Sequence, residues 1–202
     1  MKIINNITEK LSDDLQVKLT SRSRVSIAAA CFSIYAYEEL KDQLEKVDAL
    51  RFIFTSPSFL SEPTAKEKRE FYIPRQAREK TLHGSEFEIR LRNEFTQKTI
   101  SKECADWVRR KAQFKSNCTD ETMPGFLAVD SEHPVAYAPI NGFTRADLGC
   151  ERGGNMFSMI QQLDAPESKA YLQLFDQLWA DKRRMQDVTE QVLERITTAY
   201  QE

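Results

Sequence analysis

The sequence predicts an α/β protein with a mixed, largely parallel sheet flanked by helices and with further helices at the C-terminus. Residues 25–32 (VSIAAACF) form a continuous apolar run, which is typical of a strand covered on both faces. Residues 33–50 carry an apolar stripe at helical spacing, and residues 50–56 (LRFIFTS) form a second apolar run. A strand, a helix and a strand within about 30 residues indicate a βαβ unit, so this part of the sheet is expected to be parallel.

Two helices near the N-terminus are expected to begin at polar caps. Asn6 is a plausible N-cap for an amphipathic helix, since apolar residues follow at four-residue spacing: Ile7, Leu11, Leu15 and Leu19. Ser33 is expected to cap the helix of the βαβ unit.

The segment after the second apolar run is less regular. Proline and glycine breakers interrupt residues 57–85, and an insertion of this length is more often functional or mobile than idle. Residues 86–111 then show helical spacing, which predicts two helices or one bent helix.

The second half of the chain predicts further strands and then helices. Residues 112–117, 125–130, 135–140 and 153–163 are expected to form strands, the second and third separated by the polar turn 131–134. Two helical stripes follow: Leu172, Phe175 and Trp179, and Val188, Val192 and Ile196. We therefore expect a domain over 1–163 and a helical extension over 164–202.

Composition favours a folded protein of the cytoplasm. Of its 202 residues, 41% are apolar and 30% charged, which suits one sizeable core. The apolar runs are too short to span a bilayer, and Asn and Glu interrupt the N-terminus where a signal peptide would be apolar. We expect no membrane contact.

Cysteine and histidine usage does not favour a metal site. The four cysteines lie far apart without a CxxC pair, and the chain has only His83 and His133 to assist them. We expect reduced thiols without a functional role, and neither a metal nor another cofactor for this chain.

Charge is unevenly distributed. The chain has a net charge of −2, but the segment from Lys66 to Lys115 holds 14 Lys and Arg against 8 Asp and Glu, a net charge of +6. Such a segment can attract a polyanion, although a solvated helical face is the plainer interpretation. The candidate nucleic-acid-binding residues in it are Arg75, Arg78, Lys80, Arg90, Arg92, Arg109, Arg110, Lys111 and Lys115.

The stretch NGFTRADLG (141–149), after two apolar runs around a polar turn, carries a family resemblance. It resembles the phospholipase D superfamily, especially the nuclease-like branch. That branch has a strand with the pattern His-x-Lys-x-x-x-x-Asp, a second strand, and then Gly-Ser-x-Asn-Phe-Thr before a short helix. Phe143 and Thr144 fix the register. The resemblance implies a mixed sheet and, in active members, two half-sites that meet in a dimer.

In this register the motif is degenerate. The histidine position falls on Met123, the lysine on Gly125, the aspartate on Asp130 and the asparagine on Gly142, so only the aspartate remains. The family's chemistry needs a nucleophilic imidazole and donors that hold negative charge on the phosphate oxygens. A thioether and two glycines supply neither, and we expect no catalytic residue at these positions.

Most of the chain also resembles the region that precedes the motor in large bacterial superfamily-two helicases. The segments that carry this resemblance are 25–56, 86–117 and 174–202. The resemblance implies an ATP-binding, ATP-hydrolysing motor elsewhere in the parent chain. This chain itself has no GxxxxGK[ST] loop, so the motor would have to follow Glu202.

Three functions therefore stand as hypotheses. The first is a non-catalytic module of a helicase that binds nucleic acid, DNA in preference to RNA, or docks to the motor. The second is a phosphodiesterase with an unusual nucleophile such as His83 or His133. The third is a dimerisation or interaction scaffold that uses Phe175, Trp179 and the last helix, although such stripes are usually ordinary core.

Overall fold

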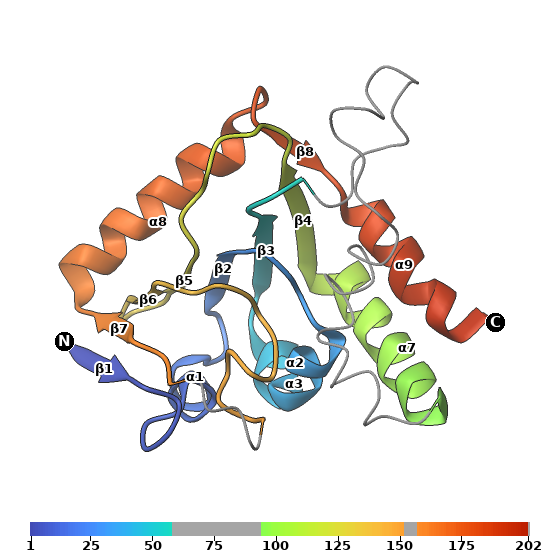
Figure 1. Cartoon of the computed structure of the whole chain (residues 1–202), viewed down its shortest axis with the longest axis horizontal. Coiled ribbons are helices and arrows are strands. Elements are labelled where there is room, and N and C mark those ends of the chain that lie inside the picture. Colours follow the sequence, from blue (N-terminus) through green and yellow to red (C-terminus); the bar gives the residue numbers. More distant parts are fainter. Residues whose placement is uncertain (58–93, 152–156, 202) are drawn as a thin grey trace.

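The structure is a computed structural model that describes residues 1–57, 94–151 and 157–201. Figure 1 shows a central sheet with helices on both of its faces. The described sheet has eight strands in the order β1-β7-β6-β5-β2-β3-β4-β8. The predicted mixed α/β architecture is confirmed.

The centre of the sheet is the predicted βαβ region. β2 (Arg24–Ala29), β3 (Ala49–Phe54) and β4 (Ala112–Asn117) lie side by side and are parallel. β2 and β3 have apolar residues on both faces, as their continuous apolar runs predict, whereas β4 has polar residues on the face of Gln113 and Lys115.

The remaining strands are antiparallel to their neighbours. β5 (Phe126–Asp130) pairs with β2 and with β6 (Val135–Ala138), and β7 (Ile160–Leu163) pairs with β6. The expectation of a largely parallel sheet is wrong, because five of the seven described pairings are antiparallel. A short turn such as 131–134 reverses the chain, and two strands joined in this way can only pair antiparallel.

Two edge strands were not predicted. β1 (Lys2–Ile4) pairs with β7, and β8 (Met185–Asp187) pairs with β4. β8 lies between α8 (Ala165–Ala180) and α9 (Thr189–Gln201). The segment 164–202 therefore supplies a strand to the sheet as well as helices, and its side chains belong to the same core as the rest of the sheet.

One face of the sheet is covered by most of the helices. α1 (Leu11–Lys18), α2 (Ile34–Glu39), α3 (Lys41–Lys46), α7 (Glu94–Lys111) and α9 contribute to its core. Aromatic rings fill the centre: Phe32 stacks on Trp107 and Phe143 and meets the edges of Phe52 and Phe114. The Trp107 indole also donates a hydrogen bond to the Leu44 carbonyl at 2.9 Å.

Helix α8 lies on the opposite face (Figure 1). Buried Phe175 packs edge-on against Phe126 of β5, and Tyr171 packs against the same ring. The stripes that predicted the C-terminal helices are thus used inside the chain, Phe175 under α8 and Val192 and Ile196 under α9. Their interpretation as ordinary core is confirmed.

The helix starts agree with prediction at one cap and not at the other. The Ser33 hydroxyl accepts a hydrogen bond from the Tyr35 backbone N–H at 3.1 Å, so this cap is confirmed.

The single helix predicted within residues 33–50 is divided into α2 and α3, because Leu40 between them leaves helical geometry. For residues 86–111 the sequence predicts two helices or one bent helix, and α7 is one helix over its described residues.

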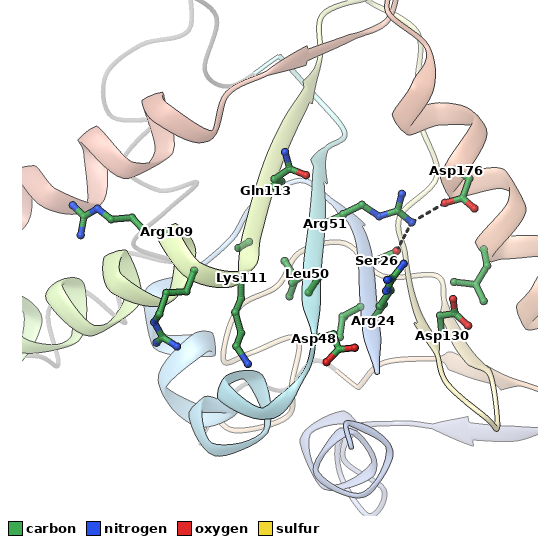
Figure 2. Close-up of a pocket in the computed structure, with 15 residues that line it drawn as sticks. Arg24, Ser26, Asp48, Leu50, Arg51, Arg109, Lys111, Gln113, Asp130 and Asp176 are labelled. Atoms are coloured by element: carbon green, nitrogen blue, oxygen red, sulfur yellow. Dashed lines mark hydrogen bonds and ion pairs between the residues drawn. The ribbon is translucent and has the colours of Figure 1, made fainter. Parts of the chain in front are cut away.

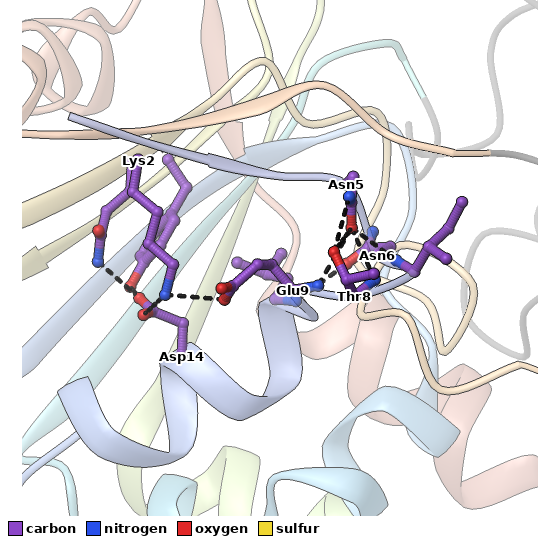
Figure 3. Close-up of polar contacts among 10 residues, drawn as sticks. Lys2, Asn5, Asn6, Thr8, Glu9 and Asp14 are labelled. Carbon is purple, nitrogen blue, oxygen red and sulfur yellow. Dashed lines mark hydrogen bonds and ion pairs between the residues drawn. The ribbon is translucent and has the colours of Figure 1, made fainter.

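Asn6 does not cap α1, which begins at Leu11 after Lys10. The neighbouring Asn5 carboxamide oxygen accepts hydrogen bonds from the backbone N–H groups of the turn that follows (Figure 3). Asn6 instead has a φ of 62°, and its side-chain oxygen accepts from the Leu11 N–H at 2.9 Å. The pair of asparagines builds a turn before the helix, which shifts the helix start.

A polar cluster joins α1 to the outer strands. Asp14 accepts hydrogen bonds from the Tyr137 hydroxyl of β6 and, at 2.8 Å, from the Gln162 amide of β7. Lys2 of β1 bridges Asp14 and Glu9 (Figure 3). Burial and the hydrogen bond to Asp14 raise the pKa of Tyr137. This cluster fixes the β1, β6 and β7 end of the sheet on α1.

No helix in the described part of the chain is both long enough and apolar enough to cross a membrane.

Candidate functional site

Three of the degenerate motif positions meet at one end of the sheet. Met123 and Gly125 precede β5, at the end where the parallel strands β2 to β4 finish. The Gly125 carbonyl accepts a hydrogen bond from Ile140 N–H at 2.9 Å, and Phe143 N–H donates to the Cys31 carbonyl at 2.9 Å. Gly142 lies between these two contacts and therefore at the same end.

Asp130 lies at the other end of β5. It lies five positions after Gly125, and at about 3.4 Å per residue these five steps span roughly 17 Å. Asp130 is exposed and pairs across the sheet with Arg24, the first residue of β2. The one motif residue that the sequence retains is therefore far from the other three positions.

A side chain at either glycine position would meet neighbouring atoms, backbone at Gly125 and the ends of side chains at Gly142. A Cβ atom on Gly125 would lie 1.8 Å from the Ile140 carbonyl oxygen. On Gly142 it would lie 2.6 Å from Cys31 Sγ and 2.8 Å from an Asp147 carboxylate oxygen. Met123 is nearly buried in the core under α8. Packed backbone and side chains thus occupy the place of the lysine and asparagine.

The stretch NGFTRADLG forms a capped turn. Asp147 accepts hydrogen bonds from the Thr144 N–H and hydroxyl at 3.2 and 2.7 Å, and the Thr144 hydroxyl accepts from the Asp147 N–H at 3.2 Å. This reciprocal pattern is that of a capping box. The polar residues that attract notice in the sequence serve the turn itself.

An open cleft of about 550 Å³ lies at the opposite end of the sheet, near Asp130. Its floor is formed by the first residues of β2, β3 and β4, with α8 on one side and the end of α7 on the other (Figure 2). Five basic and three acidic residues line it: Arg24, Arg51, Arg109, Arg110, Lys111, Asp48, Asp130 and Asp176. The lining residues themselves carry a net charge of +2, which favours anions, before the ion pairs of Arg109 with Asp106 and of Arg110 with Glu45 are counted.

Arg51 is held at the floor of the cleft. Its guanidinium donates hydrogen bonds to the Asp176 carboxylate at 2.7 Å and to the Ser26 hydroxyl at 3.3 Å (Figure 2). It also lies 4.9 Å from the ring centre of Phe175 and 5.6 Å from that of Trp179. Arg51 is 32% exposed whereas Asp176 is 64% exposed, so solvent screens the pair from the carboxylate side.

Arg24 projects from β2 on the same face as Arg51. The two guanidinium groups lie near Ser26, on the α8 side of β3 (Figure 2). Arg24 is exposed, and it makes no ion pair or hydrogen bond with side chains in the part of the chain that the structure describes. The floor therefore presents two neighbouring cations, and of these only Arg51 has an ion pair with a described residue.

The end of α7 forms the rim. Arg109 bonds Asp106 at 3.0 Å, and its side chain points away from the strands (Figure 2). Arg110 bonds Glu45 at 2.7 Å, and Lys111 Nζ donates to the backbone carbonyls of Glu45 and Val47. Cations are favoured at a helix C-terminus because the carbonyl ends of the peptide dipoles point there.

Glu45 is the acidic partner of this rim. Partial burial pushes its pKa up, but hydrogen bonds from Arg110 and Tyr37 outweigh this and hold the pKa below its ordinary value. Burial and the hydrogen bond to Glu45 in turn raise the pKa of the Tyr37 hydroxyl. Glu45 therefore stays ionised and anchors α3 to the end of α7.

The sequence-predicted cations are only partly brought together. Arg109, Arg110 and Lys111 share the cleft. Lys115 does not line it, since its Nζ donates to the Trp179 carbonyl at 2.9 Å and lies 4.6 Å from the centre of that ring. The remaining candidates lie outside the described residues: Arg75, Arg78, Lys80, Arg90 and Arg92.

Sequence reasoning missed Arg24 and Arg51. Arg24 ends the charged turn 20–24 and Arg51 is a single charge in an apolar run, and both lie outside the basic segment 66–115. The two-residue period of a strand places Arg24 and Ser26 on one face, but the pairing of Ser26 with Arg51 appears only in the register of the folded sheet.

Neither histidine lies with the motif positions. His133 is exposed in the turn after β5 and lines two further hollows beside Asp130, while His83 is outside the described residues. Within the described ranges no three His, Cys, Asp or Glu side chains come close enough to share a metal ion.

Comparison of the sequence with models of known protein families gives no match, and comparison with curated proteins gives none either.

Proposed function

We propose that the chain is a non-catalytic nucleic-acid-binding domain. The observation that carries this proposal is the cleft at the β2 to β4 floor, where basic residues from two strands and one helix line a single hollow. Phosphate groups are recognised mainly by Arg and Lys, and a basic cleft is the electrostatic footprint of such a partner. DNA is the preferred candidate over RNA.

The wider identity that we propose is a phospholipase D-like domain that precedes a superfamily-two helicase motor in its parent chain. The degenerate motif supports a role without chemistry of its own, because Gly125 and Gly142 are enclosed by neighbouring atoms. A phosphodiesterase would need a nucleophile beside a phosphate site. His133 does not line the cleft, but it lines a neighbouring hollow together with Arg24 and Asp130, so this alternative is decided by the cleavage test below.

The scaffold alternative has less support. Phe175 is buried against the sheet, and Trp179 stacks on Phe175 beneath Arg51 and Lys115. These aromatic side chains already have partners within the chain, so they do not favour a second copy or another protein as the primary partner.

Fluorescence anisotropy with a labelled 20-base DNA, single-stranded and duplex, tests the proposal at 50 to 200 mM salt. We expect binding that weakens steeply as salt rises, because each neutralised phosphate releases counterions. Replacing Arg109 and Arg110 by Gln should reduce the slope of log K against log salt by about 1.4 to 1.8, from 0.7 to 0.9 per contact.

The matched control removes two exposed lysines outside the cleft, Lys102→Gln with Lys182→Gln, and should leave the slope unchanged. The absence of binding at 50 mM salt, or an equal effect of the two double variants, would contradict the proposal. Cleavage of the labelled DNA, with or without EDTA, would contradict its non-catalytic part, and a His133→Ala variant would then test that histidine as the nucleophile.

A further inference from the structure

The cleft has two sets of cations that differ in how a ligand can reach them. Arg109 and Arg110 lie at the rim with 48% and 52% of their side chains exposed, and both come from the end of α7. Arg51 is 32% exposed on the floor and lies between the sheet and α8. A ligand that touches only the outer surface meets the rim set, and a ligand that enters the cleft meets the floor set.

The size of the cleft limits what can enter. A volume of about 550 Å³ is in the range that encloses one small ligand, about 300 to 1,000 Å³. A duplex is a wide rod with its phosphates on the outside, so it reaches the rim more readily than the floor. A single strand can place a phosphate on the floor, because one of its nucleotides can turn away from the others.

The floor is arranged to hold one anion. Arg24 and Arg51 lie on one face of neighbouring parallel strands, and their guanidinium groups approach the same region near Ser26 (Figure 2). Two like charges repel each other, and a phosphate between them would relieve the repulsion. Arginine also matches phosphate geometry, since two of its N–H groups can bind two phosphate oxygens together.

We propose that the cleft selects single-stranded nucleic acid and that Arg24 and Arg51 hold one of its phosphates on the floor. This rests on the proposed function and adds the class of ligand. The site lies at the end of the sheet opposite Met123, Gly125 and Gly142 and is separate from these three positions, whereas Asp130, the fourth, lines it.

Asp176 opposes this binding. Its carboxylate bonds the Arg51 guanidinium at 2.7 Å and repels an incoming phosphate. Asp48 and Asp130 line the same cleft and also reduce its attraction for anions. Asp176→Asn keeps the size of the side chain and removes its charge, so this variant should bind single strands several-fold more tightly than the natural protein.

The test measures the affinity of each variant for a 20-base single strand and for the matching duplex at 50 mM salt. We expect Arg24→Gln with Arg51→Gln to weaken single-strand binding at least about tenfold, as for loss of two charge-assisted contacts, and duplex binding less than about threefold. Arg109→Gln with Arg110→Gln should weaken both ligands by similar factors.

Arg24→Gln alone is the variant that controls for misfolding. Arg24 makes no ion pair with the described residues, so its loss should not affect the fold. Circular dichroism confirms folding for every variant. If the floor variants weaken single-strand and duplex binding by the same factor, or weaken neither while the rim variants weaken both, the floor assignment is wrong and the proposed function stands. If the natural protein binds neither ligand, both are wrong.

Discussion

Restoring the lysine of the degenerate motif, Gly125→Lys, should destabilise the protein strongly. The new Cβ would lie 1.8 Å from the Ile140 carbonyl oxygen, and real Cβ atoms essentially never approach closer than 3.0 Å. The segments that contain Gly125 and Ile140 must therefore move apart by more than an ångström, which strains packed residues at a cost of about 1 to 3 kcal/mol. The separation also breaks the 2.9 Å Ile140 to Gly125 hydrogen bond, which costs about 1 to 3 kcal/mol more.

The expected loss of about 2 to 6 kcal/mol is a large part of the roughly 5 to 15 kcal/mol that stabilises a typical domain. Urea denaturation followed by circular dichroism measures it. Gln173→Lys is the matched control, because it adds the same charge at an exposed position of α8 and should change the stability by less than about 0.5 kcal/mol.

A Gly125→Lys protein within about 1 kcal/mol of the natural one would refute the reasoning that these positions are closed. Recovery of DNA cleavage on adding Met123→His would refute it further. The expected result is that neither substitution supplies activity, because the Ile140 backbone closes on the lysine position and the Cys31 and Asp147 side chains occupy the space beside the asparagine position.

Two further predictions concern the packing around the cleft. Glu45 has a lowered pKa in the fold, so its charge stabilises the protein above the ordinary Glu pKa and this contribution disappears as pH falls through the folded value. Glu45→Gln should therefore lower the urea midpoint more at pH 7 than at pH 3, and an equal change at both would contradict this. Phe175→Ala should cost about 3 to 5 kcal/mol in urea denaturation, because the ring is fully buried. The exposed control Gln177→Ala should cost under about 0.5 kcal/mol, and a similar loss for both would contradict the packing.

The elements that sequence predicted best are those with long, regular patterns. β2 and β3 are continuous apolar runs, and β5 and β6 flank an obvious polar turn. β1 and β8 have only three residues each, too few to show a period, and they exist because an exposed sheet edge offers them hydrogen bonds. The missed strands thus depend on tertiary contacts that no local pattern contains.

Only part of the candidate site could be predicted from the sequence, because the rest depends on tertiary contacts. Three adjacent basic residues at the end of α7 form a visible cluster, and the structure places Arg109, Arg110 and Lys111 together. Arg24 and Arg51 are 27 positions apart and share a face only because β2 and β3 pair in one register. A pairing register is a property of the folded sheet, so the floor of the cleft becomes visible only there.

The two ends of the sheet explain why the proposed site lies where it does. In open α/β sheets, ligands usually bind outside the carboxyl ends of the parallel strands. Here that end holds Gly125 against Ile140 and Phe32 against Phe143. At the other end, α8 packs mainly on β5 and β6, so the beginnings of β3 and β4 line an open cleft. A chain that closes the usual site can therefore still offer a basic surface for a phosphate backbone, at the opposite end of the same strands.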